Sequence, residues 1–99
     1  MANKPRRIGL SPLAEADLED IWRYTVESWS LRQAEIYHAE IFEALEGLAS
    51  GLKIGRPADI RHGYFKYAVG SHMVYYLLRD AEIAIIRILH RRMDVGRHL

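Results

Sequence analysis

The chain has 99 residues, of which 49% are hydrophobic and 27% are charged, and its formal net charge is +1. A chain of this size and composition fits one small folded domain over residues 1–99 and excludes intrinsic disorder. It has no long uncharged apolar run, which excludes a membrane span, and no cysteine, which excludes disulfides and thiolate metal sites.

Metal and cofactor sites are not expected from the residue patterns. There is no glycine-rich phosphate loop after a strand, and no nucleophile-elbow or zinc-protease motif. The basic N-terminus is not followed by an apolar stretch and a cleavage site, so we expect no secretory signal and a cytoplasmic protein. The histidines show no close ligand pattern: His38, His62, His72, His90 and His98.

Charge is distributed unevenly along the chain. Residues 11–50 hold two basic against nine acidic residues, whereas residues 61–99 hold seven basic against three acidic ones. This separation predicts an acidic helical face and a basic sheet face. A basic face suits an acidic partner segment or a phosphate backbone, and the alternative is two solvated surfaces that only favour solubility.

The N-terminal part is expected to form a strand followed by a helix. Residues 6–11 fit a short strand with Ile8 and Leu10 on one face. Ser11 is a favourable N-cap and Pro12 a favourable first helical residue, so the helix is expected to begin at Pro12. Its apolar positions recur at helical spacing and are expected to face the core: Leu18, Ile21, Trp22, Thr25 and Trp29.

A second helix is expected after a tight corner, which makes a helical hairpin. Ser30 and Gln33 have the spacing of a capping box that restarts the helix, and Gly51 is placed to end it in a left-handed turn. The carboxylates of both helices, Asp17 among them, are expected to form a solvated face. The apolar stripe of the second helix consists of Ala34, Tyr37, Ile41, Ala44, Leu45 and Leu48.

The C-terminal part is expected to form an antiparallel meander. Residues 52–63 lack periodicity and read as a long loop, and two-residue turns begin at Gly70 and Asp80. Strands are expected over residues 64–69, 72–79 and 82–89. The predicted fold is α+β in the order β-α-α-β-β-β, with the N-terminal strand and the helical hairpin packed on one face of a mainly antiparallel sheet.

The last strand is expected to be central, because it is apolar on both faces and ends in a basic cluster at residues 90–94. Strict alternation places Ile83, Ile85 and Leu89 on one face together with Arg87. A buried, unpaired arginine would be costly, so Arg87 is predicted to lie on an open face or to meet a carboxylate, which an acidic partner segment could supply.

The strands carry more large apolar and aromatic residues than one covered face needs. This excess predicts an exposed aromatic patch that contacts a partner, and the alternative is that part of the set packs under the long loop. The residues concerned are Tyr64, Tyr67, Met73, Tyr75, Tyr76 and Leu78.

Several local motifs, in this order, resemble the ParE-type toxins of the RelE/ParE superfamily of toxin–antitoxin and plasmid stabilisation systems. The matching segments are residues 10–18 (Leu-Ser-Pro-Leu-Ala-Glu-Ala-Asp-Leu), 20–22, 55–57, 59–61, 63–64, 69–72, 74–76 and 86–94. The resemblance implies a non-enzymatic toxin that binds DNA gyrase and blocks replication, in a hetero-oligomer with a ParD-like antitoxin that neutralises it. No specific nucleic-acid binding and no membrane partner are expected.

The RelE-like branch of the same superfamily implies a different function, ribosome-dependent cleavage of mRNA. Met73 stands where those enzymes place a catalytic arginine, and the C-terminal tail has no tyrosine. His90 with Arg91 is the remaining acid/base and phosphate-clamping pair, and a capping or salt-bridging role is the alternative for His90. A further possibility is a degenerate, non-toxic binding module.

The predicted partner-binding surface combines the aromatic sheet residues with the basic cluster. Its predicted members are Tyr64, Lys66, Tyr75, Arg79, Arg87, His90, Arg91, Arg92 and Met93.

Overall fold

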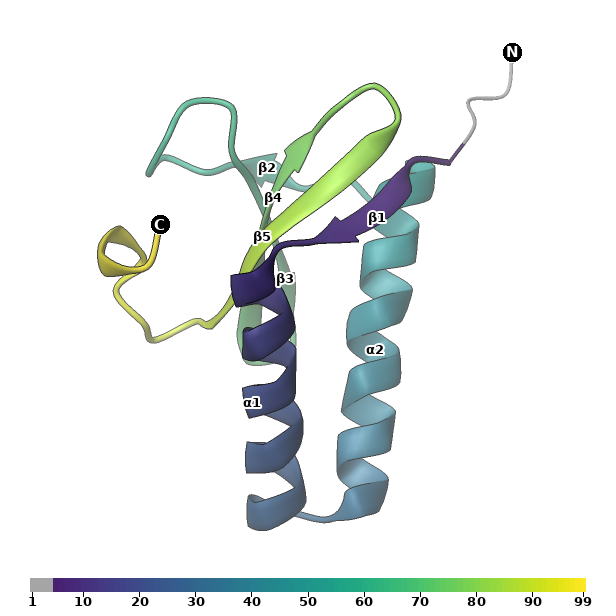
Figure 1. Ribbon diagram of the computed structural model, residues 1–99, viewed down its shortest axis with the longest axis vertical. Coiled ribbons are helices and arrows are strands. Elements are labelled where there is room, and N and C mark those ends of the chain that lie inside the picture. The colour runs from purple at the N-terminus through teal and green to yellow at the C-terminus, as the bar shows by residue number, and fades with distance from the viewer. Residues whose placement is uncertain (1–4) are drawn as a thin grey trace.

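A computed structural model describes residues 5–99 (Figure 1). Residues 1–4 of the basic N-terminal segment lie outside the described part. The elements are β1 (Arg7–Leu10), α1 (Pro12–Ser28), α2 (Leu31–Ser50), β2 (Arg56–Pro57), β3 (Phe65–Val69), β4 (His72–Leu78), β5 (Glu82–His90) and a 3₁₀ turn η1 (Val95–Arg97). No helix within residues 5–99 is long and apolar enough to cross a membrane.

The strands form one five-stranded sheet in the order β1-β5-β4-β3-β2. β1 runs parallel to β5, and the other neighbours are antiparallel. The predicted α+β class and element order are confirmed, with one correction and one addition. The N-terminal strand, expected to pack on a face of the sheet with the hairpin, lies in the sheet as its edge strand β1, because it pairs with β5. The segment expected to be a plain loop contributes β2, because Arg56 and Pro57 pair with the end of β3.

The helix ends follow from local sequence. The Ser11 hydroxyl accepts a hydrogen bond from the Ala14 amide at 3.0 Å, and the Ser30 hydroxyl accepts one from the Gln33 amide at the same distance. Gly51 ends α2 with φ of 85°, which favours glycine. The predicted capping residues therefore do set the bounds of the hairpin.

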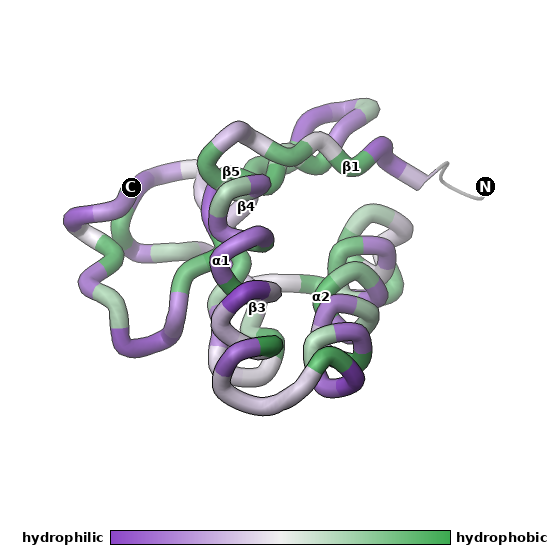
Figure 2. The backbone as a smooth tube through the Cα atoms, turned by 60° about the horizontal axis from the view of Figure 1, so that its bottom comes forward, coloured by the Kyte–Doolittle hydropathy of each residue, from purple (hydrophilic) through white to green (hydrophobic). Residues whose placement is uncertain are grey.

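The main core lies between the hairpin and one face of the sheet. In Figure 1 the two helices run side by side and antiparallel, and in Figure 2 the central strands β4 and β5 are mostly hydrophobic. Trp29, predicted as a core residue, is an exception: its side chain is 75% exposed at the hairpin corner, since α1 ends at Ser28. The largest fully buried side chains are Ile41, Leu45, Val74, Ile83, Ile85 and Leu89.

A β-bulge in β5 changes which side chains share a face. Tyr76 pairs with Ile85 but Tyr75 pairs with Arg87, so Ile86 has no partner opposite it. After the bulge, Ile88 joins Ile83 and Ile85 in the core under the helices, while Leu89 packs on the other face. The predicted grouping of Ile83 and Ile85 with Leu89 is therefore wrong.

The second face of the sheet is covered by the chain itself. Ala58 from the long loop, together with Val95 and Leu99 from the C-terminal segment, packs on Tyr75 and Leu89. The prediction of an open aromatic patch is therefore wrong. Tyr67 and Tyr76 lie on the helix side, Tyr64, Met73 and Tyr75 lie under the loop and tail, and Leu78 is exposed.

Candidate partner-binding site

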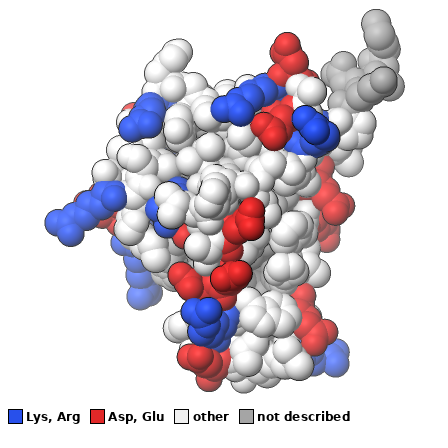
Figure 3. All heavy atoms as spheres, in the orientation of Figure 1, with Lys and Arg blue, Asp and Glu red and all other residues white. Residues whose placement is uncertain are grey.

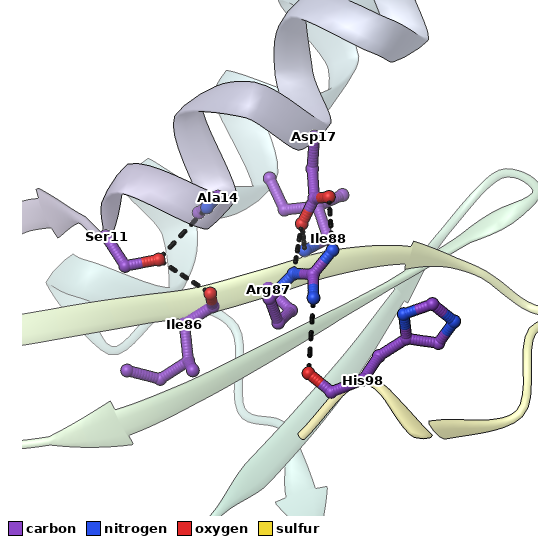
Figure 4. Close-up of polar contacts among 7 residues, drawn as sticks. All are labelled: Ser11, Ala14, Asp17, Ile86, Arg87, Ile88 and His98. Carbon is purple, nitrogen blue, oxygen red and sulfur yellow. Dashed lines mark hydrogen bonds and ion pairs between the residues drawn. The ribbon is translucent and has the colours of Figure 1, made fainter. Parts of the chain in front are cut away.

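β5 continues past the end of β1, so the backbone groups on this part of the β5 edge need other hydrogen-bond partners. The Ser11 hydroxyl donates to the Ile86 carbonyl at 2.7 Å, and the Asp17 carboxylate accepts from the Ile88 amide at 2.9 Å (Figure 4). Ser11 is the N-cap of α1, and Asp17 lies in the second turn of that helix. Thus the edge of β5 is closed by side chains where the neighbouring strand stops.

Asp17 also binds Arg87 through two charge-assisted hydrogen bonds, at 2.8 Å to Nε and 2.7 Å to Nη2. The two side chains are 11% and 14% exposed, so the pair is largely removed from water. The hydrogen bonds that Arg87 donates to the Asp17 carboxylate raise the pKa of the guanidinium above its ordinary value, against the opposing effect of burial. Arg87 does meet a carboxylate, but that carboxylate belongs to the same chain.

The pair corrects the expectation for Asp17. Asp17, expected on a solvated helical face, points instead at β5 (Figure 4). The remaining Arg87 donor, Nη1, reaches the His98 carbonyl at 3.2 Å and so ties the C-terminal segment to the sheet. All three Arg87 nitrogens are hence engaged within the chain.

A second polar network lies at the turn between β3 and β4. The Tyr37 hydroxyl donates to the Val69 carbonyl at 2.9 Å and accepts from the Ser71 amide at 3.2 Å. It also lies 2.6 Å from Nδ1 of His72. Because the hydroxyl proton goes to Val69, the network assigns the His72 proton to Nδ1 and leaves its Nε2 as an acceptor.

His72 stands directly opposite His90 across β4 and β5, with ring centroids 5.3 Å apart. Burial lowers the pKa of His72 to about 4, and the nearby His90 acts in the same direction, while Asp17 opposes it. Nδ1 of His90 accepts from the Arg92 amide at 3.1 Å, which holds the turn after the strand. His90 is therefore a structural acceptor at this turn as well as part of the surface.

These histidines line a groove of about 800 Å³ between the hairpin and the ends of β4 and β5. Its outer wall includes two large exposed side chains, Tyr24 at 66% and Trp29 at 75%, and Met93 is 49% exposed on the side of β5. We call this the hairpin groove. It is lined by Asp20, Ile21, Tyr24, Thr25, Trp29, Gln33, Tyr37, Ser71, His72, His90 and Met93.

The predicted site residues fall into separate places. His90 and Met93 line the hairpin groove, and the exposed Arg91 and Arg92 lie between them. Arg79 is exposed at the far end of β4, 3.3 Å from Glu82. The remaining aromatic and basic members, Tyr64, Lys66 and Tyr75, are half-buried or buried around the loop and C-terminal segment.

Of the eleven residues that line the groove, only His90 and Met93 belong to the predicted site, and the missed ones include the aromatic and imidazole groups of Tyr24, Trp29, Tyr37 and His72. Tyr37 and Trp29 were assigned to the core by helical spacing alone, and His72 was treated only as the start of a strand. No His/Cys/Asp/Glu cluster in the described residues fits a metal ion. The groove combines exposed aromatic groups with the neutral imidazole of His72, and two exposed arginines lie beside it, an arrangement suited to binding.

The His72 environment predicts a specific pH dependence of stability. Because its pKa is lowered from 6.5 to about 4 in the folded state, its contribution to stability is complete above pH 6.5 and is lost as pH falls toward 4. We expect His72→Gln to reduce the slope of unfolding free energy against pH in this window, measured by urea denaturation. The exposed His62→Gln variant is the control and should retain the wild-type slope. Identical slopes for all three proteins would contradict this assignment.

Comparisons with known proteins agree over nearly the whole chain. Residues 8–95 match the family model described as ParE toxin of type II toxin-antitoxin system, parDE. The chain is 45% identical over 92 residues to Toxin ParE1 of Mycobacterium tuberculosis, covering 91% of this chain and 94% of that protein. It is 40% identical over 97 residues to Toxin ParE1 of Caulobacter vibrioides, covering 97% and 98%.

A solved structure has the same fold. It is a chain of the chromosomal ParDE TA system from P. aeruginosa, with a TM-score of 0.75 and 21% identity, covering 86% of this chain and 95% of that one.

Proposed function

The chain belongs to the ParE toxin family of type II toxin–antitoxin systems, and from this premise we propose that it inhibits DNA gyrase by binding and is neutralised by a ParD-like antitoxin. The observation that carries the proposal is the match to the ParE family model over residues 8–95. The structural relative from P. aeruginosa belongs to a ParDE toxin–antitoxin system, which supports an antitoxin partner. The proposed place of action is the cytoplasm.

The site chemistry supports binding over bond cleavage. Met73 packs with Tyr75 and Leu89 in the small second core and offers neither a proton nor a charge. His90 uses Nδ1 to hold the Arg92 amide, and His72, with a pKa of about 4, is a weak base. The exposed aromatic groups of the hairpin groove and the two exposed arginines beside it are typical of protein interfaces.

Charge distribution is consistent with a protein partner on the C-terminal side. Figure 3 shows acidic side chains over the helical hairpin and basic ones at the edge that carries the loop and C-terminal segment. Arg91 and Arg92 are exposed there, next to the hairpin groove. An acidic surface or segment would complement this edge.

A supercoiling assay tests the proposal. We expect the purified chain, in stoichiometric excess, to stop supercoiling of relaxed plasmid by gyrase, and pre-incubation with the antitoxin from the neighbouring gene to restore it. Arg91→Gln/Arg92→Gln should weaken the inhibition, because it removes two exposed charges beside the hairpin groove, whereas Arg32→Gln on α2 is the control. Unchanged supercoiling in the presence of a folded chain would contradict gyrase inhibition.

The ribonuclease alternative has one observation in its favour, the meeting of His72 and His90 beside Arg91. It makes the opposite forecast: mRNA is cut at codons in expressing cells while gyrase remains active. If His90→Ala and Arg91→Ala both retain full toxicity, the ribonuclease reading fails.

A further inference from the structure

The hairpin groove contains a hydrogen-bond acceptor that the chain itself does not use. Nδ1 of His72 is committed to Tyr37, and no hydrogen bond to its Nε2 is formed within residues 5–99. The ring lies in a half-buried position, opposite His90 and lining the groove. A group that occupies the groove therefore meets an acceptor and must bring a donor to satisfy it.

The walls around this acceptor are apolar and aromatic. Trp29 and Tyr24 stand on the helical side with most of their surface exposed, and Met93 stands on the strand side. Large rigid rings and a flexible thioether favour contact with another aromatic side chain. The groove volume of about 800 Å³ exceeds that of one side chain, so it has room for the flanking backbone as well.

Charge at the groove selects for an acidic neighbour. Arg91 and Arg92 are exposed between two groove residues, and neither makes an ion pair within the described part of the chain. The one carboxylate of the groove, Asp20, is 3.2 Å from Arg23. Free arginines beside an apolar slot complement a carboxylate that is next to an apolar anchor.

We propose that the hairpin groove binds a segment of a protein partner through a tyrosine side chain whose hydroxyl donates to Nε2 of His72, with a neighbouring carboxylate on Arg91 and Arg92. The ring of that tyrosine lies between Trp29 and Met93. This inference rests on the proposed function in one respect, namely that the chain acts by binding protein. It adds the place and chemistry of recognition.

Synthetic peptides test the recognition directly. The probe is an eight-residue peptide with one central tyrosine flanked by glutamates, titrated into the full chain and followed by ¹H–¹⁵N NMR, which includes the Trp29 indole signal. We expect chemical-shift changes only for residues that line the hairpin groove. The phenylalanine analogue is expected to bind about five- to tenfold more weakly, because it cannot satisfy the acceptor. The analogue in which glutamines replace the flanking glutamates is expected to bind more weakly, and its affinity should depend less on salt concentration.

Matched variants of the chain test which residues recognise the hydroxyl and the carboxylates of the peptide. His72→Phe keeps an aromatic ring and is expected to bind the tyrosine and phenylalanine peptides equally. The double variant Arg91→Gln/Arg92→Gln should bind the glutamate and glutamine peptides with equal affinity. Arg32 is exposed on α2 and does not line the groove, so Arg32→Gln should bind both peptides as the wild type does. If circular dichroism shows that His72→Phe is unfolded, the affinities of the wild type for the tyrosine and phenylalanine peptides test whether the tyrosine hydroxyl is the donor.

Three results would overturn the proposal: no binding at millimolar peptide, equal binding of the tyrosine and phenylalanine peptides to the wild type, or shifts on another surface. Binding of free p-cresol as tightly as the peptide would also overturn it, because the groove would then recognise a small phenol. The supercoiling assay uses no peptide, so peptide binding without gyrase inhibition would refute only the proposed target.

Discussion

Asp17→Ala is expected to lower the free energy of unfolding by about 3–5 kcal/mol, because it leaves the largely buried Arg87 charge unpaired. It also removes the acceptor of the Ile88 amide on the edge of β5. A domain of this size has a total stability of roughly 5–15 kcal/mol, so the loss should be visible as a large shift in the urea midpoint. Hydrogen exchange of the Ile88 amide should accelerate in parallel.

Asp20→Ala is the matched control on the same helix. Asp20 and Arg23 form an exposed pair whose side chains are 74% and 63% accessible, so its loss should cost less than about 1 kcal/mol. The double variant Asp17→Leu/Arg87→Met should be more stable than Asp17→Ala, because no charge remains unpaired. Equal unfolding midpoints for Asp17→Ala and Asp20→Ala would contradict the role assigned to the buried pair.

Ile85→Ala is expected to destabilise the chain by about 2–5 kcal/mol, because Ile85 is fully buried between the sheet and the helices. Its neighbour Ile86, the extra residue of the bulge, is only half-buried, and Ile86→Ala should cost about 1 kcal/mol. The two variants delete the same atoms at adjacent positions. The difference between their urea midpoints therefore measures the register that the bulge imposes, and equal losses would contradict that register.

The Asp17–Arg87 pair also limits which basic residues are available to a partner. Arg87 is held by Asp17 and by the His98 carbonyl, and because Asp17 already neutralises its charge, a partner carboxylate gains less from Arg87 than from an unpaired arginine. Arg91 and Arg92, which directly follow the end of β5 at His90, are exposed. The basic end of β5 thus divides into a structural arginine and two surface arginines.

The hairpin and its limits could be predicted from sequence because their determinants are local. Ser11, Pro12, Ser30 and Gly51 act within one helical turn of their own position, and each has the predicted role. The same holds for the turn at Gly70, whose φ of 54° suits glycine. The α+β class followed from these local signals together with the period of the apolar residues.

The candidate site could not be predicted in the same way, because a single bulge decides it. Counting back from the β4–β5 turn without a bulge places His72 opposite Leu89, whereas the structure pairs His72 with His90. Helical spacing likewise assigned Trp29 to the core, although the corner after Ser28 turns it outward. The periodicity of apolar residues indicates neither the bulge in β5 nor the direction of the chain at the corner after Ser28.

The sequence by itself determined the element order, the capping residues and the basic character of residues 90–94, since each depends on neighbours along the chain. Only the tertiary structure decided that Arg87 is neutralised by Asp17 and that the loop and tail cover the second face. It also decided that His72 lies beside His90. Asp17 and Arg87 are far apart in sequence, and their contact forms only when α1 packs against the edge of β5 that β1 leaves unpaired.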